Sequence, residues 1–163
     1  MTDQSIIYFY SVSDEYGEFS NFAAYSIKLK GKRWPTSEHY FQGQKFQDAG
    51  HREEVRRAKT PMLAARIGRD RKKKLRRDWE SIKDNVMREA VMAKFTQHDA
   101  VRELLLATGQ AKIVEHTAND AYWGDGGDGS GQNMLGRILM EVRAKLRERV
   151  TKVVGGESLE EQA

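Results

Sequence analysis

The segment that follows Trp34-Pro35 contains three polar side chains whose spacing could support acid–base or nucleophilic chemistry. Glu38, Gln42 and Lys45 stand at positions i, i+4 and i+7, so on a helix they share one face. A carboxylate beside an amine could act as a general acid or base next to a nucleophile or an anion-binding group. A solvent-exposed polar helix face has the same pattern, and the spacing alone leaves both interpretations open.

A glycine-rich segment, 119–132, is the second candidate, because its five glycines would let the backbone approach a ligand closely. Trp123 could stack on a base, and Asp125 could orient a hydroxyl group or a water molecule. The helix expected to follow would offer free N–H groups to an anion near Asn133. A calcium-binding turn is the alternative, but the spacing lacks the carboxylates and terminal Glu of an EF-hand.

A basic run over residues 66–77 is the third candidate, with eight Lys or Arg and one Asp. Such a run suggests an anionic partner. Arg69, Arg71 and Lys72–Lys74 could hold a phosphate group, and Trp79 after them could stack on a base. The alternatives are a solvated surface turn and, for Trp79, a core anchor at the start of a helix.

The hydrophobic pattern predicts a helix-rich α+β domain with a few short strands to position these residues. Lys30-Gly31 predicts a hairpin turn, Thr60-Pro61 predicts a helix start, and Gly68 predicts that helix's end. Strands are expected over 6–10, 25–29, 32–34 and 112–115, and helices over 36–48, 52–59, 61–68, 79–97, 99–109 and 133–149.

Length and composition limit the classes of protein that are possible. A chain of 163 residues favours one domain, expected over 1–150, with 151–163 as a flexible tail. The absence of cysteine excludes a disulfide, a thiol nucleophile and a cysteine zinc site. The four histidines show no metal-ligand spacing, so no metal is expected. The start, Met1–Ser5, does not resemble a signal peptide, and no apolar run approaches the ~20 residues of a membrane span. A cytoplasmic protein without a membrane partner is therefore expected.

In these residues and their order the sequence resembles the NADAR family. The resemblance extends over residues 6–149 and rests on Phe9-Tyr10, Phe19-Ser20-Asn21-Phe22, the run from Trp34 to Gln42, Gln44-Lys45-Phe46, Ala65-Arg66, Gly68-Arg69, Trp79, Lys94-Phe95 and Trp123-Gly124-Asp125-Gly126.

The resemblance implies a single α+β domain that hydrolyses N-glycosidic bonds without a cofactor. It implies two classes of phosphorylated, nucleotide-like substrate: phosphoribosylamino-pyrimidine intermediates of riboflavin biosynthesis, and ADP-ribose on the amino group of guanine in DNA or RNA. By this resemblance Glu38, Lys45 and Asp125 are expected to be catalytic. Substrate binding is expected from Asn21, Phe22, Gln42, Arg69, Trp79, Trp123, Gly124 and Asn133.

In both substrate classes the anomeric carbon is bonded to an exocyclic amine, so the sugar can open to an imine. Lys45 could attack that carbon only as a neutral amine, which requires a pKa below the usual value of about 10.4. Glu38 is then expected to move a proton from the lysine to the leaving nitrogen. Direct water attack, with Glu38 or Asp125 as base, is the alternative mechanism. A module that binds ADP-ribose or nucleic acid without turnover is the alternative function, and the sequence leaves the physiological substrate and the oligomeric state open.

Overall fold

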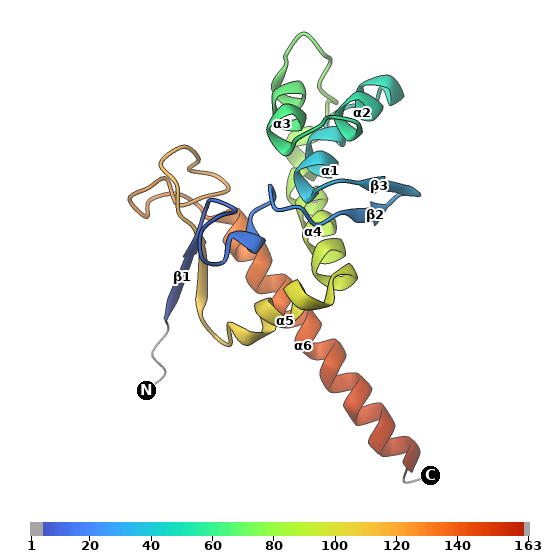
Figure 1. The fold of residues 1–163 in the computed structure, drawn as a ribbon, viewed down its shortest axis with the longest axis vertical. Helices are drawn as coiled ribbons and strands as arrows, with labels where there is room; N and C mark the ends of the chain where they lie inside the picture. Colours follow the sequence, from blue (N-terminus) through green and yellow to red (C-terminus); the bar gives the residue numbers. More distant parts are fainter. Residues whose placement is uncertain (1–4, 162–163) are drawn as a thin grey trace.

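The computed structural model describes the backbone of residues 5–161 and the side chains of residues 5–152. This part of the chain forms six α-helices and two small sheets (Figure 1). They enclose a main hydrophobic core and a smaller cluster of Phe46, Val55 and Ala64. The predicted helix-rich α+β class is therefore confirmed. The strands are β1 (Ile6–Phe9), β2 (Ile27–Leu29), β3 (Lys32–Trp34) and β4 (Lys112–Glu115). The helices are α1 (Ser37–Gly43), α2 (Ala49–Arg56), α3 (Pro61–Arg69), α4 (Trp79–Gln97), α5 (Asp99–Ala107) and α6 (Met134–Glu161), with a 3-10 turn at Gly17–Phe19.

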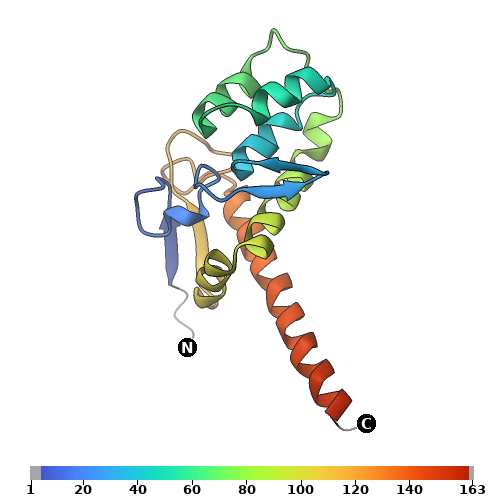
Figure 2. The ribbon, with the colours of Figure 1, turned by 45° about the vertical axis from the view of Figure 1, so that its right-hand side comes forward.

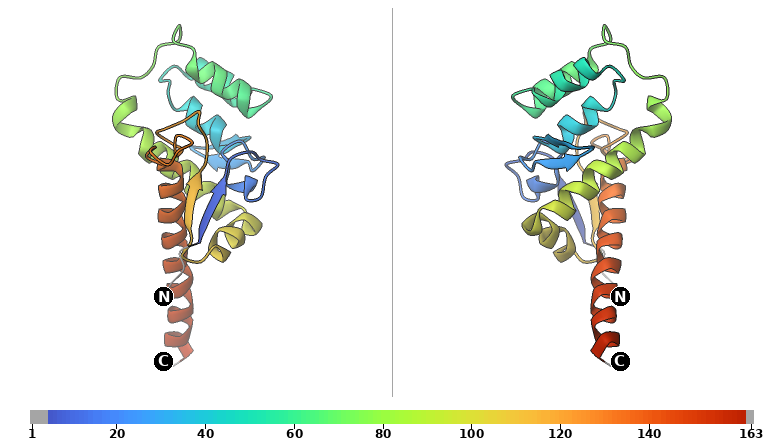
Figure 3. Two further views of the ribbon diagram at one scale, coloured as in Figure 1. Left: turned by 90° about the vertical axis from the view of Figure 1, so that its left-hand side faces the viewer. Right: turned by 90° about the vertical axis from the view of Figure 1, so that its right-hand side faces the viewer.

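The first sheet joins two segments that lie far apart in the sequence. Strand β1 pairs with β4 in parallel, from Ile6 with Lys112 to Phe9 with Glu115. Figure 3 shows the two strands side by side, next to α6. Because the carboxyl ends of parallel strands meet at one edge, the loop after β1 and the residues after Glu115 leave the sheet together.

The second sheet is the hairpin predicted around Lys30-Gly31. Strands β2 and β3 are antiparallel, and Lys30 and Gly31 both have positive φ, 54° and 75°. Two left-handed residues are the requirement of the tight turn that suits a two-stranded hairpin. The hairpin also fixes Trp34, whose indole nitrogen donates to the Leu29 carbonyl at 3.2 Å.

Two predicted helix boundaries are wrong near α1. The helix ends at Gly43 and not at Asp48, because its last turn tightens and the N–H of Lys45 donates to the Gln42 carbonyl at 3.2 Å. Asp48 instead begins α2, since its carboxylate accepts the His51 N–H at 2.9 Å. Helix α2 therefore spans Ala49–Arg56, a few residues earlier than expected.

Helix α3 begins as predicted, with the Thr60 hydroxyl accepting the Leu63 N–H at 3.1 Å. Gly68, however, does not end the helix, which continues to Arg69. A Cβ at position 68 would collide with the buried amide of Gln42 and lie 2.8 Å from its Cδ. Gly68 is thus a point of close approach between α3 and α1.

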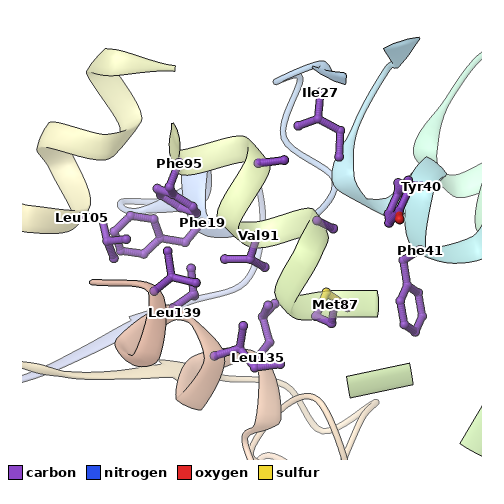
Figure 4. Close-up of a cluster of buried hydrophobic side chains, with 14 of the residues drawn as sticks. Phe19, Ile27, Tyr40, Phe41, Met87, Val91, Phe95, Leu105, Leu135 and Leu139 are labelled. Atoms are coloured by element: carbon purple, nitrogen blue, oxygen red, sulfur yellow. The ribbon is translucent and has the colours of Figure 1, made fainter. Parts of the chain in front are cut away.

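The core lies between α4 and α6 and includes aromatic residues from the N-terminal third of the chain. Figure 4 shows Phe19 and Phe95 beside Leu139, with Met87 and Leu135 further along the same cluster. Helix α4 has the predicted bounds. Helix α1 packs against its buried face, and residues of both helices belong to the same cluster.

Helix α6 continues to Glu161, beyond the end expected at Arg149. Figures 1 and 2 show its C-terminal half projecting away from the other elements. The flexibility expected of residues 151–163 stays a prediction, because most of their side chains lie outside the described residues. No helix within residues 5–161 is long and apolar enough to cross a membrane.

Candidate active site

A cavity of about 500 Å³ opens between α1, α3, the loop after β1 and the glycine-rich segment. A volume of this size suits a nucleotide-like ligand. The lining residues include both charged and apolar side chains: Tyr10, Ser11, Val12, Ser20, Asn21, Phe22, Glu38, Phe41, Gln42, Lys45, Met62, Arg69, Met87, Glu115, Thr117, Asn119, Asp120 and Trp123.

Helix α1 supplies Glu38 and Gln42, and the turn after it supplies Lys45. All seven residues of the helix are buried, so it is not the solvated polar face that the spacing left open. Its start is fixed by Thr36, whose hydroxyl accepts the His39 N–H at 3.1 Å. Although Lys45 lies past the helix end, the Arg76 N–H holds its carbonyl at 2.9 Å, and its side chain still lines the cavity.

Glu38 is 7% exposed and is held by the side chain one helical turn later. The amide Nε2 of Gln42 donates to its Oε1 at 2.7 Å. Burial raises the pKa of Glu38, against the lowering effects of the Gln42 hydrogen bond, Lys45 and Arg69. A raised pKa makes the carboxylate a better proton acceptor than a free glutamate side chain.

Lys45 lies against aromatic rings at the base of the cavity. Its Nζ is 5.7 Å from the centroid of Phe41 and 5.9 Å from that of Trp79. Burial, with the nearby charge of Arg71, lowers the pKa of Lys45 to about 8, although Glu38 opposes the shift. At pH 7 roughly a tenth of the molecules therefore carry a neutral amine there, the form that can act as a nucleophile.

Three aromatic rings form one side of the site, with different exposure. Phe41 packs against Trp79 at a centroid distance of 5.0 Å and against Trp123 at 5.3 Å. Trp123 is partly exposed and lines the cavity. Trp79 is 5% exposed and is absent from the lining, so it packs behind Phe41 and Lys45 as the core anchor that the sequence offered as its alternative role.

Asn21 and Phe22 line the cavity beside α1. The Asn21 side-chain oxygen accepts the Ser37 hydroxyl at 2.8 Å. The preceding residue is anchored by Lys94, which is fully enclosed and donates to the Ser20 carbonyl at 2.9 Å. Burial lowers the pKa of Lys94 to about 7.

Asp125, which was expected to be catalytic, does not line the cavity. Its Oδ1 accepts the N–H groups of Thr117 and Gly127 at 3.0 and 2.9 Å, and its Oδ2 lies 2.7 Å from His116 Nδ1. Burial opposes ionisation, but these hydrogen bonds outweigh it and lower the pKa of Asp125. Its carboxylate organises the glycine-rich segment.

Gly124 and Asn133 do not line the cavity either, and their contacts are with neighbouring segments of the chain. Asn133, with φ 53°, accepts the Glu115 N–H at 2.9 Å and donates to the Ile113 carbonyl at 2.9 Å. At Gly124 a Cβ would lie 2.8 Å from the Thr117 side chain. These two residues hold the end of β4 against the start of α6.

Two acidic residues of the cavity, Glu115 and Asp120, were missed by the sequence reasoning. Asp120 accepts the N–H groups of Tyr122 and Trp123 at 2.9 and 2.8 Å, which fixes Trp123. Glu115 is the last residue of β4. A polar residue at the carboxyl end of a strand, next to a glycine-rich loop, is a signal that could have identified it. The exposed apolar residues Tyr10, Val12 and Met62 at the rim carry no such signal.

The basic run divides into residues with different contacts. Arg69 is exposed and lines the cavity. Arg71 donates to the carbonyls of Gly68 and Arg69, and Lys73 pairs with Asp70 at 3.4 Å. Lys74 lines a separate surface hollow. Among the described residues no three His, Asp or Glu side chains are grouped so that they could hold a metal ion.

Comparison with known proteins shows which family the whole domain belongs to. Residues 8–147 match the NADAR domain. The chain belongs to the NADAR family. It is 66% identical over 142 residues to N-glycosidase YbiA of Escherichia coli (strain K12), covering 87% of this chain and 89% of the relative. An N-glycosidase of Nostoc punctiforme is 45% identical over 144 residues, covering 86% and 92%.

Two further comparisons concern a solved structure and a longer relative. The NMR structure of Escherichia coli YbiA superposes with a TM-score of 0.86 at 62% identity, covering 93% of this chain and 90% of that one. A riboflavin biosynthesis protein of Vibrio vulnificus is 47% identical over 142 residues, which are 87% of this chain and 39% of the longer relative. This NADAR chain is an N-glycosidase, and the alternative of a binding module without turnover is not supported.

Proposed function

We propose that this enzyme hydrolyses the bond between the anomeric carbon of a ribose phosphate and an exocyclic amine. The observation that carries the proposal is the pairing of buried Glu38 with Lys45 in one cavity, where the pKa of the lysine is lowered to about 8. A neutral amine beside a carboxyl group is the combination that a lysine nucleophile requires.

In this mechanism the ring oxygen of the glycosylamine takes a proton as the ring opens, which leaves a protonated imine, and the neutral Nζ of Lys45 attacks the imine carbon. Glu38 takes the proton that the lysine nitrogen then carries and returns it to the leaving nitrogen. The amine departs as the carbon–nitrogen bond to it breaks, leaving the sugar as an iminium on Lys45. Water attacks that carbon and releases the open-chain sugar, the neutral lysine and one proton. Gln42 orients Glu38 throughout by its hydrogen bond of 2.7 Å.

The remaining lining residues support a substrate with a base and a phosphate. Trp123 offers a partly exposed ring for stacking, and Arg69 offers a guanidinium group for a phosphate. The Vibrio relative, named as a riboflavin biosynthesis protein, supports a phosphoribosylamino-pyrimidine as the substrate. ADP-ribosylated guanine in DNA or RNA has the same glycosylamine chemistry and is the second candidate, favoured by the basic run beside Arg69.

The test is a side-by-side turnover assay on a phosphoribosylamino-pyrimidine and on DNA carrying ADP-ribosylated guanine, with borohydride added during turnover. We expect release of the free amine and a stable sugar adduct on Lys45. Lys45→Arg should abolish both, because the guanidinium stays protonated, whereas Lys28→Arg on the exposed face of β2 should change neither. Turnover without an adduct would favour direct water attack, and an absence of turnover on both substrates would refute the proposed substrate class.

A further inference from the structure

A second carboxyl group, that of Glu115, faces the cavity from the end of β4. Its backbone is held on both sides by the segments that follow. The Glu115 N–H donates to the Asn133 side-chain oxygen at 2.9 Å, and its carbonyl accepts the Asp125 N–H at 2.9 Å. The side chain is therefore presented to the cavity from a fixed backbone.

The surroundings of this carboxyl group disfavour its ionised form. The Oε2 atom of Glu115 is enclosed by protein and has no hydrogen-bond partner. The nearby groups whose charge acts on this carboxyl group are themselves acidic: Asp120, Glu38 and Asp125. An enclosed carboxylate oxygen without a donor, near other carboxylates, is destabilised relative to the neutral acid. Burial and these neighbours raise the pKa of Glu115 to about 7.

The other carboxyl groups of the cavity are engaged in a different way. Glu38 accepts the Gln42 amide at 2.7 Å, and Asp120 accepts two backbone N–H groups at 2.8 and 2.9 Å. Each of these two carboxylates thus has at least one hydrogen-bond donor from the protein. Of the three lining carboxyl groups, Glu115 has an enclosed oxygen that no protein donor reaches, and a protonated carboxyl is a hydrogen-bond donor.

We propose that Glu115 is a further catalytic residue, the acid that protonates the ring oxygen of the ribose when the glycosylamine opens. The proposal rests on the proposed function, in which the open imine precedes attack by Lys45. The bond between C1 and the ring oxygen breaks, and the oxygen takes the proton of the Glu115 carboxyl. The lone pair of the exocyclic nitrogen forms the C1–N double bond. Glu115 regains a proton from the one that is released when water hydrolyses the Lys45 iminium, so each turnover restores the acid.

The pH dependence of the rate follows from two groups, each of which must be in its less populated protonation state at the same time. Glu115 must be protonated, with a pKa of about 7, and Lys45 must be neutral, with a pKa of about 8. Both conditions hold best between these two values. The rate falls about tenfold per pH unit below pH 7, as Lys45 gains its proton, and about tenfold per unit above pH 8, as Glu115 loses its own.

The first experiment is Glu115→Gln, which keeps the shape and a donor but cannot transfer a proton. We expect kcat to fall by roughly 10²–10⁴, with KM nearly unchanged and with the decline above pH 8 removed. Glu103→Gln, on the exposed face of α5, should keep the wild-type rate and both limbs of the profile. A Glu115→Gln enzyme that retains more than about a tenth of the rate, or the decline above pH 8, would overturn the assignment while leaving the proposed function intact.

The second experiment separates ring opening from lysine attack. Glycolaldehyde phosphate has an open aldehyde and no ring, so cyanoborohydride should attach it to Lys45 in wild type and in Glu115→Gln alike. The phosphoribosylamino-pyrimidine should label wild type but not Glu115→Gln. Loss of both labels in Glu115→Gln would show that Glu115 maintains the shape of the site and is not its acid. A wild-type enzyme that the open aldehyde does not label would overturn the Lys45 route and the Glu115 assignment with it.

A wild-type measurement keeps the test decisive even if Glu115→Gln does not fold. Labelling by the cyclic substrate should decline above pH 8, whereas labelling by glycolaldehyde phosphate should rise through the pKa of Lys45, about 8, and then level off. Cyclic labelling that also levels off above pH 8 would exclude an acid of this kind.

Discussion

Two regions form the cavity, and they position their side chains by different means. Helix α1 is enclosed on all sides, so its geometry directs Glu38 and Gln42 at fixed spacing toward the cavity. The glycine-rich segment 119–132 has no helix or strand. Its shape comes from backbone N–H groups that donate to the carboxylates of Asp120 and Asp125. The polar side chains Glu38 and Gln42 of α1 therefore line the cavity directly. Most of those in the loop instead hold the backbone of neighbouring residues in place.

The largest effect expected from this comparison is that of Glu38→Gln in α1. The variant keeps size and hydrogen bonding but loses the carboxyl proton, so turnover should fall by roughly 10²–10⁴. The melting temperature should not fall, because a buried ionisable group is replaced by a neutral one. Glu148→Gln on the exposed face of α6 is the matched control. A Glu38→Gln enzyme with more than about a tenth of the wild-type rate would show that this helix carries no essential proton.

Asp125 provides the corresponding test in the loop. Asp125→Ala leaves the buried Thr117 N–H without its acceptor, and should lower the free energy of unfolding by roughly 1–3 kcal/mol in urea titrations. Asp125→Asn keeps an acceptor oxygen and should retain most of the turnover. If Asp125→Asn instead lost as much activity as Glu38→Gln, the distinction between the two regions would be wrong and Asp125 would be catalytic.

The two tryptophans sharpen the comparison, because one lines the cavity and the other does not. Trp123→Ala should weaken substrate binding by about 1–3 kcal/mol, the usual worth of a stacked base, with a smaller change in stability. Trp79→Ala should act mainly on the free energy of unfolding, since Trp79 is 5% exposed and packs on Phe41. Equal effects of both variants on affinity would contradict the division between a binding ring and a core ring.

The smallest effect is expected at the exposed end of the basic run. Arg69→Gln should raise KM, because Arg69 lines the cavity. The double variant Lys72→Gln/Lys74→Gln should leave KM at high salt unchanged and only reduce its salt dependence, as expected of charges that steer an anion from a distance. A double variant that raised KM as much as Arg69→Gln at every salt concentration would place the phosphate closer to these lysines.

The local part of the site could be predicted from the sequence. The stripe of Glu38, Gln42 and Lys45 needs only helical spacing, and it does meet at one cavity, even though Lys45 lies in the turn after α1. Caps such as Thr60 and the hairpin at Lys30-Gly31 are equally local. In each case neighbours within a few residues determine the conformation.

The parts that sequence reasoning missed depend on contacts between distant segments. Gly68 stands inside α3 because of Gln42 in α1, which no pattern around position 68 reveals. Glu115 enters the cavity because Asn133 holds its backbone from the start of α6, and Asp125 is turned away because Thr117 and His116 engage it. Polar residue types identified the glycine-rich segment, but tertiary hydrogen bonds decided which acid lines the cavity.

The parallel pairing of β1 with β4 has a consequence for synthesis of the chain. Strand β1 leaves the ribosome before its partner Lys112–Glu115, which follows about 100 residues later. At typical translation rates β1 waits roughly 5–20 s with its hydrogen-bonding edge free. Helices α1 to α5 lie between the two strands in the sequence and can form meanwhile. The wall that contains Glu115 therefore closes last, after Asn133 has emerged, and nascent chains stalled before α6 would carry α1 without a functional cavity.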